Sequence, residues 1–377
     1  MKFIFSGIFI LSLLAADSVS SNCRFYFPSP AEDTTDGSKL DLDGPHIIYR
    51  NGYAVIKQIQ KVENAFYTVS DSVQGSLKGK LISCNVNDSL FFSTLVKDTL
   101  INEDCVFEMP EKLIAISDIE GNFEAFRDFL INNGVINSDN QWLFGMGHLV
   151  LNGDFFDRGL NVTECLWFIY HIEQEAVKNG GYVHFILGNH EIMNMNDDIR
   201  YVRNKYAETS KFINEDYKDL YKPNTELGRW LETKNIVEKI GPYLFLHGGI
   251  SEELNLLNPT IEEINTKSRE YYYSSKAARV SGDTLVSTIF RSKYSPFWYR
   301  GYVQETIKED SLNITLKIFD VEKIVVGHTI VDDVRYFYQG KVIAIDTDHA
   351  SGDTEGLLIE NGNEYRVDRA GNKYEIK

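Results

Sequence analysis

The most constraining feature of the sequence is the heptapeptide GDFFDRG at residues 153–159, which follows the apolar run 149–151 and precedes a helical pattern. Asp154 therefore stands at the end of a predicted strand, where its two carboxylate oxygens can reach two cations at once. Asp157 and Arg158 project from the turn behind it, and the glycines let the backbone approach closely. The pattern predicts a metal site. A strand–turn–helix junction with chance acids is the alternative.

Four other apolar runs end in the same way. The segments that follow them are SDIEGN at 117–122, GNHE at 188–191, HGG at 247–249 and GHT at 327–329. Aspartate, asparagine and histidine provide the oxygen and nitrogen ligands that hard and borderline metal ions take. Five strands that end in such residues make coincidence a poor explanation, so the sequence predicts one shared metal centre.

The overall composition limits the class of protein. The 377 residues are 43% hydrophobic and 25% charged, which is enough for one large domain with an appendage. The formal net charge is −17, and the sequence has no run of basic residues. Because nucleic-acid binding needs clustered Lys and Arg against the phosphate backbone, we expect no nucleic-acid partner.

The N-terminus has the pattern of a secretory signal peptide. A charged start is followed by an apolar stretch that reaches Ala16 and by a small-residue cleavage pattern, so we assign residues 1–20 to the signal. The stretch is too short for a resident membrane helix. We therefore expect an exported protein, periplasmic or extracellular. Lipidation at Cys23, which would make a membrane-attached lipoprotein, is the alternative, although Asn22 is larger than the residue such sites need.

Sequence patterns divide the rest of the chain into three parts. Residues 21–43 are rich in Pro, Ser, Asp and Gly, which indicates a linker. Residues 44–109 carry short alternating runs typical of a small antiparallel β module, which either packs against the rest of the chain or binds a partner. In residues 110–377 strand and helix patterns alternate, which predicts a layered α/β catalytic domain. Within it, residues 194–238 form a polar, Tyr-rich, helical insert that is either a pocket lid or wall, or an exposed insertion.

The motifs, in this order, resemble those of the calcineurin-like metallophosphoesterase superfamily. The DRG and NHE forms at 157–159 and 189–191 are similar to its phosphoprotein phosphatase branch. LGRWL at 227–231 before HGGIS at 247–251, together with WYRG at 298–301, is similar to the Shewanella-like protein phosphatases.

The resemblance covers roughly residues 112–356. It implies an α/β fold, a four-layer α/β/β/α sandwich with the small β module before it, and a hydrolase that acts on phosphate monoesters. A water molecule shared by two divalent cations about 3.5–4 Å apart has a lowered pKa and attacks as hydroxide, while the cations hold the phosphate oxygens. The implied partner is a phosphorylated protein or small molecule.

The resemblance also implies a set of metal ligands. Six residues would hold the two cations: Asp118, Glu120, Asp154, Asn189, His247 and His328. Asp154 would bridge them, Asp118 and Glu120 would complete the first site, and the other three would complete the second. Manganese is the first choice for both ions, with iron, zinc or magnesium as alternatives.

Four further residues have catalytic roles in this interpretation. His190 would donate a proton to the leaving-group oxygen, which is worth roughly 10²–10⁴-fold. Asp157 would accept a hydrogen bond from the other ring nitrogen and fix the tautomer, or it would only cap the following helix. Arg158 and Arg300 would clamp the phosphate, because guanidinium groups match its geometry. For Arg300, an aromatic-packed surface turn is the alternative.

Glu120 departs from the family pattern Asp-x-His. It could act as a carboxylate ligand, which would favour Mn²⁺, Mg²⁺ or Fe²⁺ over Zn²⁺. It could instead hold a metal-bound water, or the first site could be lost, leaving a catalytically impaired phosphate-binding module. Because the other catalytic residue types are present, we favour the first interpretation.

The function stays open between three classes. A metal-dependent phosphomonoesterase, acting on phosphoproteins with phosphotyrosine as one target, is the first choice. A phosphodiesterase or nucleotide pyrophosphatase on the same scaffold is the second, although two arginines suit the dianion of a monoester better. An exported phosphate-binding module without turnover is the third, and Glu120 is its only support.

Overall fold

The computed structural model describes residues 24–26, 40–63, 65–349 and 352–377. The predicted signal peptide and Cys23 lie outside these residues. Within the described part, no helix is both long and apolar enough to cross a membrane.

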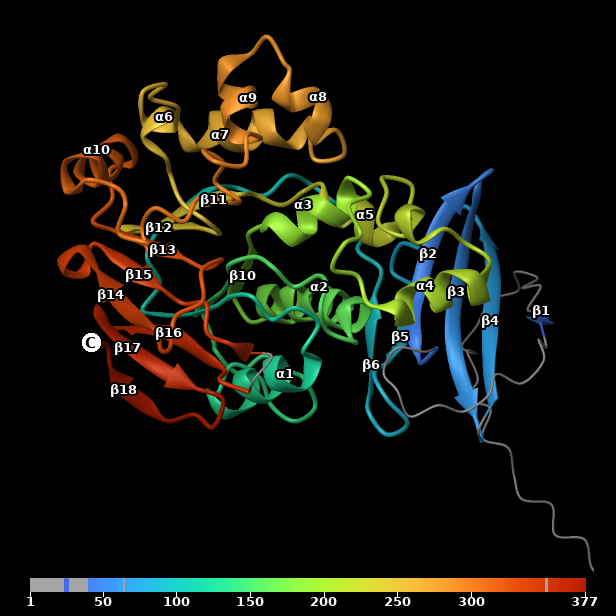
Figure 1. The fold of residues 1–377 in the computed structure, drawn as a ribbon. Helices are drawn as coiled ribbons and strands as arrows, with labels where there is room; N and C mark the ends of the chain where they lie inside the picture. The colour runs from blue at the N-terminus through green and yellow to red at the C-terminus, as the bar shows by residue number, and fades with distance from the viewer. Residues whose placement is uncertain (1–23, 27–39, 64, 350–351) are drawn as a thin grey trace, which may run out of the picture.

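Two six-stranded sheets form the centre of the molecule (Figure 1). The strands of the first, in spatial order, are β10 (Tyr182–Phe185), β9 (His148–Leu151), β8 (Lys112–Ile116), β16 (Glu355–Glu360), β17 (Asn363–Asp368) and β18 (Lys373–Glu375). The strands of the second are β14 (Arg335–Phe337), β15 (Val342–Ala344), β13 (Lys323–Val326), β12 (Tyr243–Leu246), β11 (Val237–Ile240) and β7 (Val106–Phe107). One continuous apolar cluster, which includes Ala115 and Val150 of the first sheet and Phe245 and Val325 of the second, fills the space between them.

Helices cover both outer faces of this sandwich, which confirms the predicted four-layer α/β/β/α arrangement (Figure 1). The first sheet is covered by α1 (Phe123–Asn132) and α2 (Val162–Lys178). The other side carries α6 (Glu252–Asn255), α7 (Ile261–Arg269), α8 (Ser275–Arg279), α9 (Thr284–Ile289) and α10 (Glu309–Phe319). A short helix, α3 (Asn189–Met195), begins directly after β10, and the 3-10 turn η2 (Tyr338–Gly340) joins β14 to β15.

The N-terminal strands form a separate four-stranded sheet and a hairpin. The sheet has the order β1 (Arg24–Tyr26), β4 (Ala65–Gln74), β3 (Tyr53–Val62), β2 (Asp43–Arg50), and the hairpin pairs β5 (Leu81–Asn85) with β6 (Phe91–Leu95). Strand β1 lies inside the segment that was expected to be a linker. The sequence did not predict this strand because three residues are too few to give a periodic pattern. The sheet packs on the sandwich, where Trp167 Nε1 of α2 donates a hydrogen bond to the Pro45 carbonyl at 2.7 Å.

The insert expected at 194–238 consists of short helices separated by turns. It contains α4 (Asn204–Ile213), the 3-10 turn η1 (Tyr217–Asp219) and α5 (Glu226–Leu231). Its last residues differ from the expectation, because β11 begins at Val237 and is a full member of the second sheet. This strand has only four residues, and its buried Glu238 interrupts the apolar pattern.

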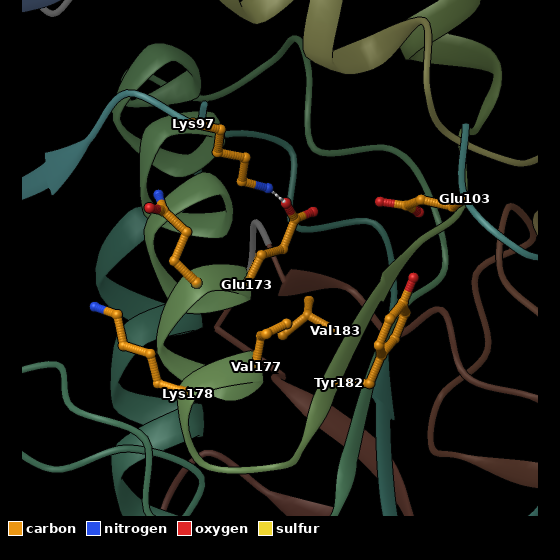
Figure 2. Close-up of a pocket in the computed structure, with 8 residues that line it drawn as sticks. Lys97, Glu103, Glu173, Val177, Lys178, Tyr182 and Val183 are labelled. Atoms are coloured by element: carbon orange, nitrogen blue, oxygen red, sulfur yellow. Dashed lines mark hydrogen bonds and ion pairs between the residues drawn. The ribbon is translucent and has the colours of Figure 1, made fainter. Parts of the chain in front are cut away.

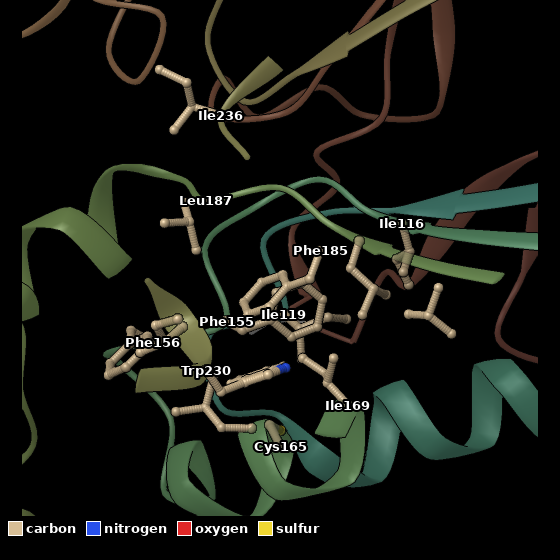
Figure 3. Close-up of a cluster of buried hydrophobic side chains, with 14 of the residues drawn as sticks. Ile116, Ile119, Phe155, Phe156, Cys165, Ile169, Phe185, Leu187, Trp230 and Ile236 are labelled. Atoms are coloured by element: carbon tan, nitrogen blue, oxygen red, sulfur yellow. The ribbon is translucent and has the colours of Figure 1, made fainter. Parts of the chain in front are cut away.

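A second apolar cluster lies beneath the Asp154 loop (Figure 3). Phe155 and Phe156, the two residues between the carboxylates of the heptapeptide, are both fully buried. The Phe155 ring packs edge-on against Phe185 at 5.4 Å between centroids, and Phe156 packs against Tyr221 at 4.8 Å. These contacts fix the loop on the core, so the buried carboxylates of Asp154 and Asp157 have defined positions.

Candidate active site

The ends of five strands meet at one edge of the sandwich. Strands β8, β9 and β10 run parallel in one sheet, and β12 and β13 run parallel in the other, so residues that follow them gather at the same edge. Two backbone hydrogen bonds join the loop after β8 to the loop after β9. Asp118 N donates to the Gly153 carbonyl at 2.9 Å, and Glu120 N donates to the Asp154 carbonyl at 3.0 Å.

Six of the ten predicted site residues have left-handed backbone conformations. They are Asp118, Glu120, Asp154, Asp157, Arg158 and His328, with φ between 50° and 70°. Such a conformation costs a non-glycine residue free energy and persists only where surrounding contacts enforce it. Strain of this kind is concentrated at functional sites, and here it turns the side chains of the strand ends toward one another. Gly188 is required as well, because a Cβ atom there would overlap the Asp154 carboxylate.

The first group of candidate ligands is Asp154, Asn189, His247 and His328. Asp154 Oδ2 lies 3.0 Å from His247 Nε2. One terminal atom of the Asn189 amide lies 3.0 Å from His247 Nε2 and 2.7 Å from His328 Nδ1. With no cation present, the amide nitrogen can donate to both imidazoles, whereas a bound cation requires the amide oxygen in this position. One ligand atom each from Asp154, His247 and His328 lies within 4.8 Å of the other two.

The second group is Glu120, Asp154 and His190, whose ligand atoms also lie within 4.8 Å of one another. Asp154 belongs to both groups, which is the position that a bridging ligand would have. Burial and the neighbouring Asp118 carboxylate raise the pKa of Glu120 to about 8. In the structure the Glu120 carboxylate forms an ion pair with the Arg158 guanidinium, whose side chain is 47% exposed.

Asp118 lies beside these groups without belonging to either. Its Oδ2 accepts hydrogen bonds from the Ser117 hydroxyl and from His328 N, the latter at 3.0 Å. Burial and the nearby Asp154 carboxylate outweigh the attraction of His247 and raise the pKa of Asp118. Asp346, which the sequence did not single out, is also buried here, and burial together with Asp118 raises its pKa well above the ordinary value.

The residues present fit divalent metal ions. Several buried carboxylates compete for few positive groups, and the buried Nε2 atom of His328 has no hydrogen-bond partner. An unpartnered buried nitrogen and unneutralised carboxylates are costly unless a cation satisfies them. Oxygen and imidazole donors in this mixture suit Mn²⁺, Fe²⁺ or Zn²⁺.

His190 is held by its predicted partner. His190 Nδ1 lies 2.6 Å from Asp157 Oδ2, and both side chains are buried. The other ring nitrogen, Nε2, lies 3.8 Å from Asp154 Oδ2 and so faces the candidate metal ligands. Burial alone would lower the pKa of His190, but the carboxylates of Asp154 and Asp157 raise it to about 9. This geometry suits a proton donor, and it also suits a metal ligand that is oriented by a carboxylate.

Arg300 lies in the segment between α9 and α10. Its Nη1 donates hydrogen bonds to the His328 carbonyl at 2.6 Å and to Thr329 Oγ1 at 3.1 Å. The guanidinium is therefore tied to the loop after β13, next to a candidate metal ligand, and it is not in a surface turn remote from the site.

Glu191 has a structural role that the sequence did not assign. Its carboxylate accepts backbone N–H groups from Asp154 at 2.9 Å, Phe155 at 2.8 Å, Phe156 at 3.3 Å and Gly188 at 2.7 Å. Glu191 occupies the third position of helix α3, where a capping box places an acidic residue. The NHE motif could therefore have predicted its hydrogen bond to Gly188 N.

The tyrosines of the insert fall into two classes. Tyr206, Tyr217 and Tyr221 are buried, whereas Tyr201 is 42% exposed. The Tyr201 ring lies 5.2 Å from the His190 ring, and the Arg158 guanidinium carbon lies 5.5 Å from its centroid. Tyr201 therefore lines the mouth of the site, as a wall would, and the other three belong to the core.

A cavity of about 350 Å³ lies elsewhere, between α2 and β10 (Figure 2). Its lining includes Lys97, Glu103, Glu173 and Tyr182, and none of the predicted site residues. Its charged groups are paired, with Lys97 on Glu173 and the buried Lys234 on both glutamates. We assign these groups to the support of α2 and not to catalysis.

Comparison with known proteins agrees with this arrangement. The model of a family described as calcineurin-like phosphoesterase matches residues 111–332. Shewanella-like protein phosphatase 2 of Arabidopsis thaliana is 28% identical over 298 residues, which cover 67% of this chain and 74% of the relative. Shewanella-like protein phosphatase 1 of Plasmodium berghei is 29% identical over 230 residues, covering 58% and 61%. The crystal structure of a cold-active protein-tyrosine phosphatase from a psychrophilic Shewanella species has a TM-score of 0.80 and 34% identity, covering 89% of this chain and 100% of that one.

Proposed function

This chain belongs to the calcineurin-like phosphoesterase family, and we propose that it is a dinuclear-metal phosphatase that hydrolyses phosphate monoesters. Its phosphatase relatives and the family's dependence on metal make it a metal-dependent phosphoester hydrolase. The proposal extends this statement to the number of ions, to the ester class and to the roles of individual residues.

The observation that carries the proposal is the double membership of Asp154. It shares one group of ligand atoms with His247 and His328, and another with Glu120 and His190. A pair of divalent ions on either side of Asp154 would lower the pKa of a shared water and neutralise the phosphate charge. Manganese is our first choice for both positions, because carboxylate and amide oxygens predominate over nitrogens in the proposed set.

The roles of the chain's own residues follow from their positions. Asp157 holds the His190 ring so that Nε2 faces the site, where it can protonate a leaving oxygen. Arg158 follows β9, and Arg300 is tied to the loop after β13; both guanidinium groups can bind phosphate oxygens with bidentate geometry. Two guanidinium groups balance the dianion of a monoester, which supports monoesters over diesters.

The proposed substrate is a phosphorylated protein, with an aromatic leaving group favoured. Support comes from the exposed Tyr201 ring beside His190, where a leaving aryl group can pack. The similar structure of a cold-active protein-tyrosine phosphatase supports this choice. We also propose that the enzyme is exported, on the evidence of the N-terminal sequence pattern; cell fractionation that finds the protein in the cytoplasm would contradict this.

A turnover assay tests the proposal. The purified enzyme is stripped of metal and supplied with Mn²⁺, Fe²⁺, Zn²⁺ or Mg²⁺, and p-nitrophenyl phosphate is compared with bis-p-nitrophenyl phosphate. We expect metal-dependent turnover with a higher kcat/KM for the monoester. A preference for the diester would indicate a phosphodiesterase instead. Phosphate binding without any turnover would indicate a binding module.

A further inference from the structure

A chain of buried hydrogen bonds leads away from the His190–Asp157 pair. Asp157 Oδ2 is occupied by His190, and Asp157 Oδ1 accepts a hydrogen bond from Asn194 Nδ2 at 3.0 Å. Asn194 Nδ2 also donates to the His190 carbonyl at 2.9 Å. On the other side of the amide, the Tyr217 hydroxyl lies 2.8 Å from Asn194 Oδ1. All four side chains are buried.

The direction of every proton in this chain follows from chemistry. A carboxylate and a carbonyl are acceptors only, so the Asn194 atom that faces both must be its nitrogen. Its oxygen therefore faces Tyr217, whose hydroxyl must donate. Burial raises the pKa of Tyr217 well above its ordinary value, so the hydroxyl keeps its proton. This series of hydrogen bonds therefore leaves Asp157 as the acceptor of the hydrogen bond from His190 Nδ1.

Tyr217 is in turn held by the N-terminal sheet. It lies in η1 between α4 and α5, and β2 and β3 hold this segment at both ends. Lys57 Nζ of β3 donates to the Ile213 carbonyl at 2.7 Å and pairs with Glu215 at 2.5 Å. Tyr49 N of β2 donates to the Asn224 carbonyl at 2.7 Å.

We propose that Asn194 and Tyr217 are positioning residues for the His190–Asp157 pair, and that the N-terminal sheet serves catalysis by fixing the segment that carries Tyr217. This inference rests on the proposed function. Without the Tyr217 hydroxyl the Asn194 oxygen loses its donor, so only the two Nδ2 hydrogen bonds hold the amide, and Asp157 and the His190 ring are less well oriented. Outer hydrogen-bond partners of this kind typically contribute about 10- to 100-fold to activity.

The variants Tyr217→Phe and Asn194→Ala test the proposal against the control Tyr273→Phe. Tyr273 is a second insert-facing tyrosine whose hydroxyl donates only to the Tyr221 and Gly228 carbonyls, at 3.0 Å each. For Tyr217→Phe we expect kcat on phenyl phosphate to fall about 10-fold or more with KM unchanged. The loss on p-nitrophenyl phosphate should be smaller, because its leaving group needs less protonation. The double variant should be no worse than Asn194→Ala, because the two residues act in series.

A spectroscopic readout separates this inference from the proposed function. We expect the proton that joins His190 Nδ1 to Asp157 to give a far-downfield NMR signal, which its loss in His190→Asn would assign. We expect this signal to shift or exchange faster in Tyr217→Phe and in Lys57→Met, and to stay unchanged in Tyr273→Phe. An unchanged signal in Tyr217→Phe, or an equal change in Tyr273→Phe, would overturn the positioning role, and an unchanged signal in Lys57→Met would overturn the role of the sheet. A shifted signal in a protein without turnover would refute the proposed function and leave the positioning role intact.

Discussion

The carboxylate of Glu120 and the guanidinium of Arg158 form an ion pair across the candidate site, between a proposed metal ligand and a proposed phosphate clamp. Each partner therefore has two possible counterions: Glu120 can be neutralised by Arg158 or by a metal ion, and Arg158 by Glu120 or by phosphate. This pairing exists because position 120 carries a carboxylate where the family pattern has histidine, since an imidazole would not hold Arg158 in the same way.

Replacing Glu120 by histidine tests whether this carboxylate is a ligand. We expect Glu120→His to shift the metal preference of the activity toward Zn²⁺. The reason is that zinc binds an imidazole ligand better than it binds a carboxylate. The measurement is the activity of the metal-free enzyme after titration with Mn²⁺ and with Zn²⁺. An unchanged preference would show that Glu120 does not coordinate the metal.

His190→Asn separates a proton donor from a metal ligand. If His190 donates a proton, kcat on phenyl phosphate falls by roughly 10²–10⁴-fold while the metal content per chain stays the same. Elemental analysis of the purified variant gives the second quantity. Loss of metal together with activity would mean that His190 is a ligand oriented by Asp157.

The sequence was sufficient to predict the strand ends but not the contacts between them. Each of the five strands is a short apolar run followed by a polar residue, and this pattern is local. The ion pair between Glu120 and Arg158 depends on left-handed turns at both residues, which no composition rule predicts. Likewise, Asn194 and Tyr217 are 23 residues apart in the sequence and are joined by a side-chain hydrogen bond. This contact depends on how the N-terminal sheet places the segment that carries Tyr217.

Tyr201→Ala tests the proposed wall for the leaving group. We expect the ratio of kcat/KM for phosphotyrosine over phosphoserine to fall about 2- to 10-fold, the value of one aromatic contact. Tyr53→Ala, which removes a similarly exposed tyrosine at the start of β3 in the N-terminal sheet, is the matched control. A ratio that does not change in Tyr201→Ala would place the leaving group elsewhere.

Glu191→Gln tests the support of the Asp154 loop. An amide has one acceptor oxygen and turns its own donors toward N–H groups, so several of the four backbone donors lose their partner. We expect the free energy of unfolding to fall by about 2–3 kcal/mol, measured by urea denaturation of the metal-free protein. The exposed Glu262→Gln is the control, and equal stability of the two variants would contradict the proposed support.

The central claim is that the five strand ends hold two divalent ions that share Asp154. Anomalous diffraction from a crystal of the enzyme reconstituted with Mn²⁺ measures this directly. We predict two manganese peaks about 3.5–4 Å apart, with Asp154 between them. A single peak, or peaks that do not contact Asp154, would contradict the claim.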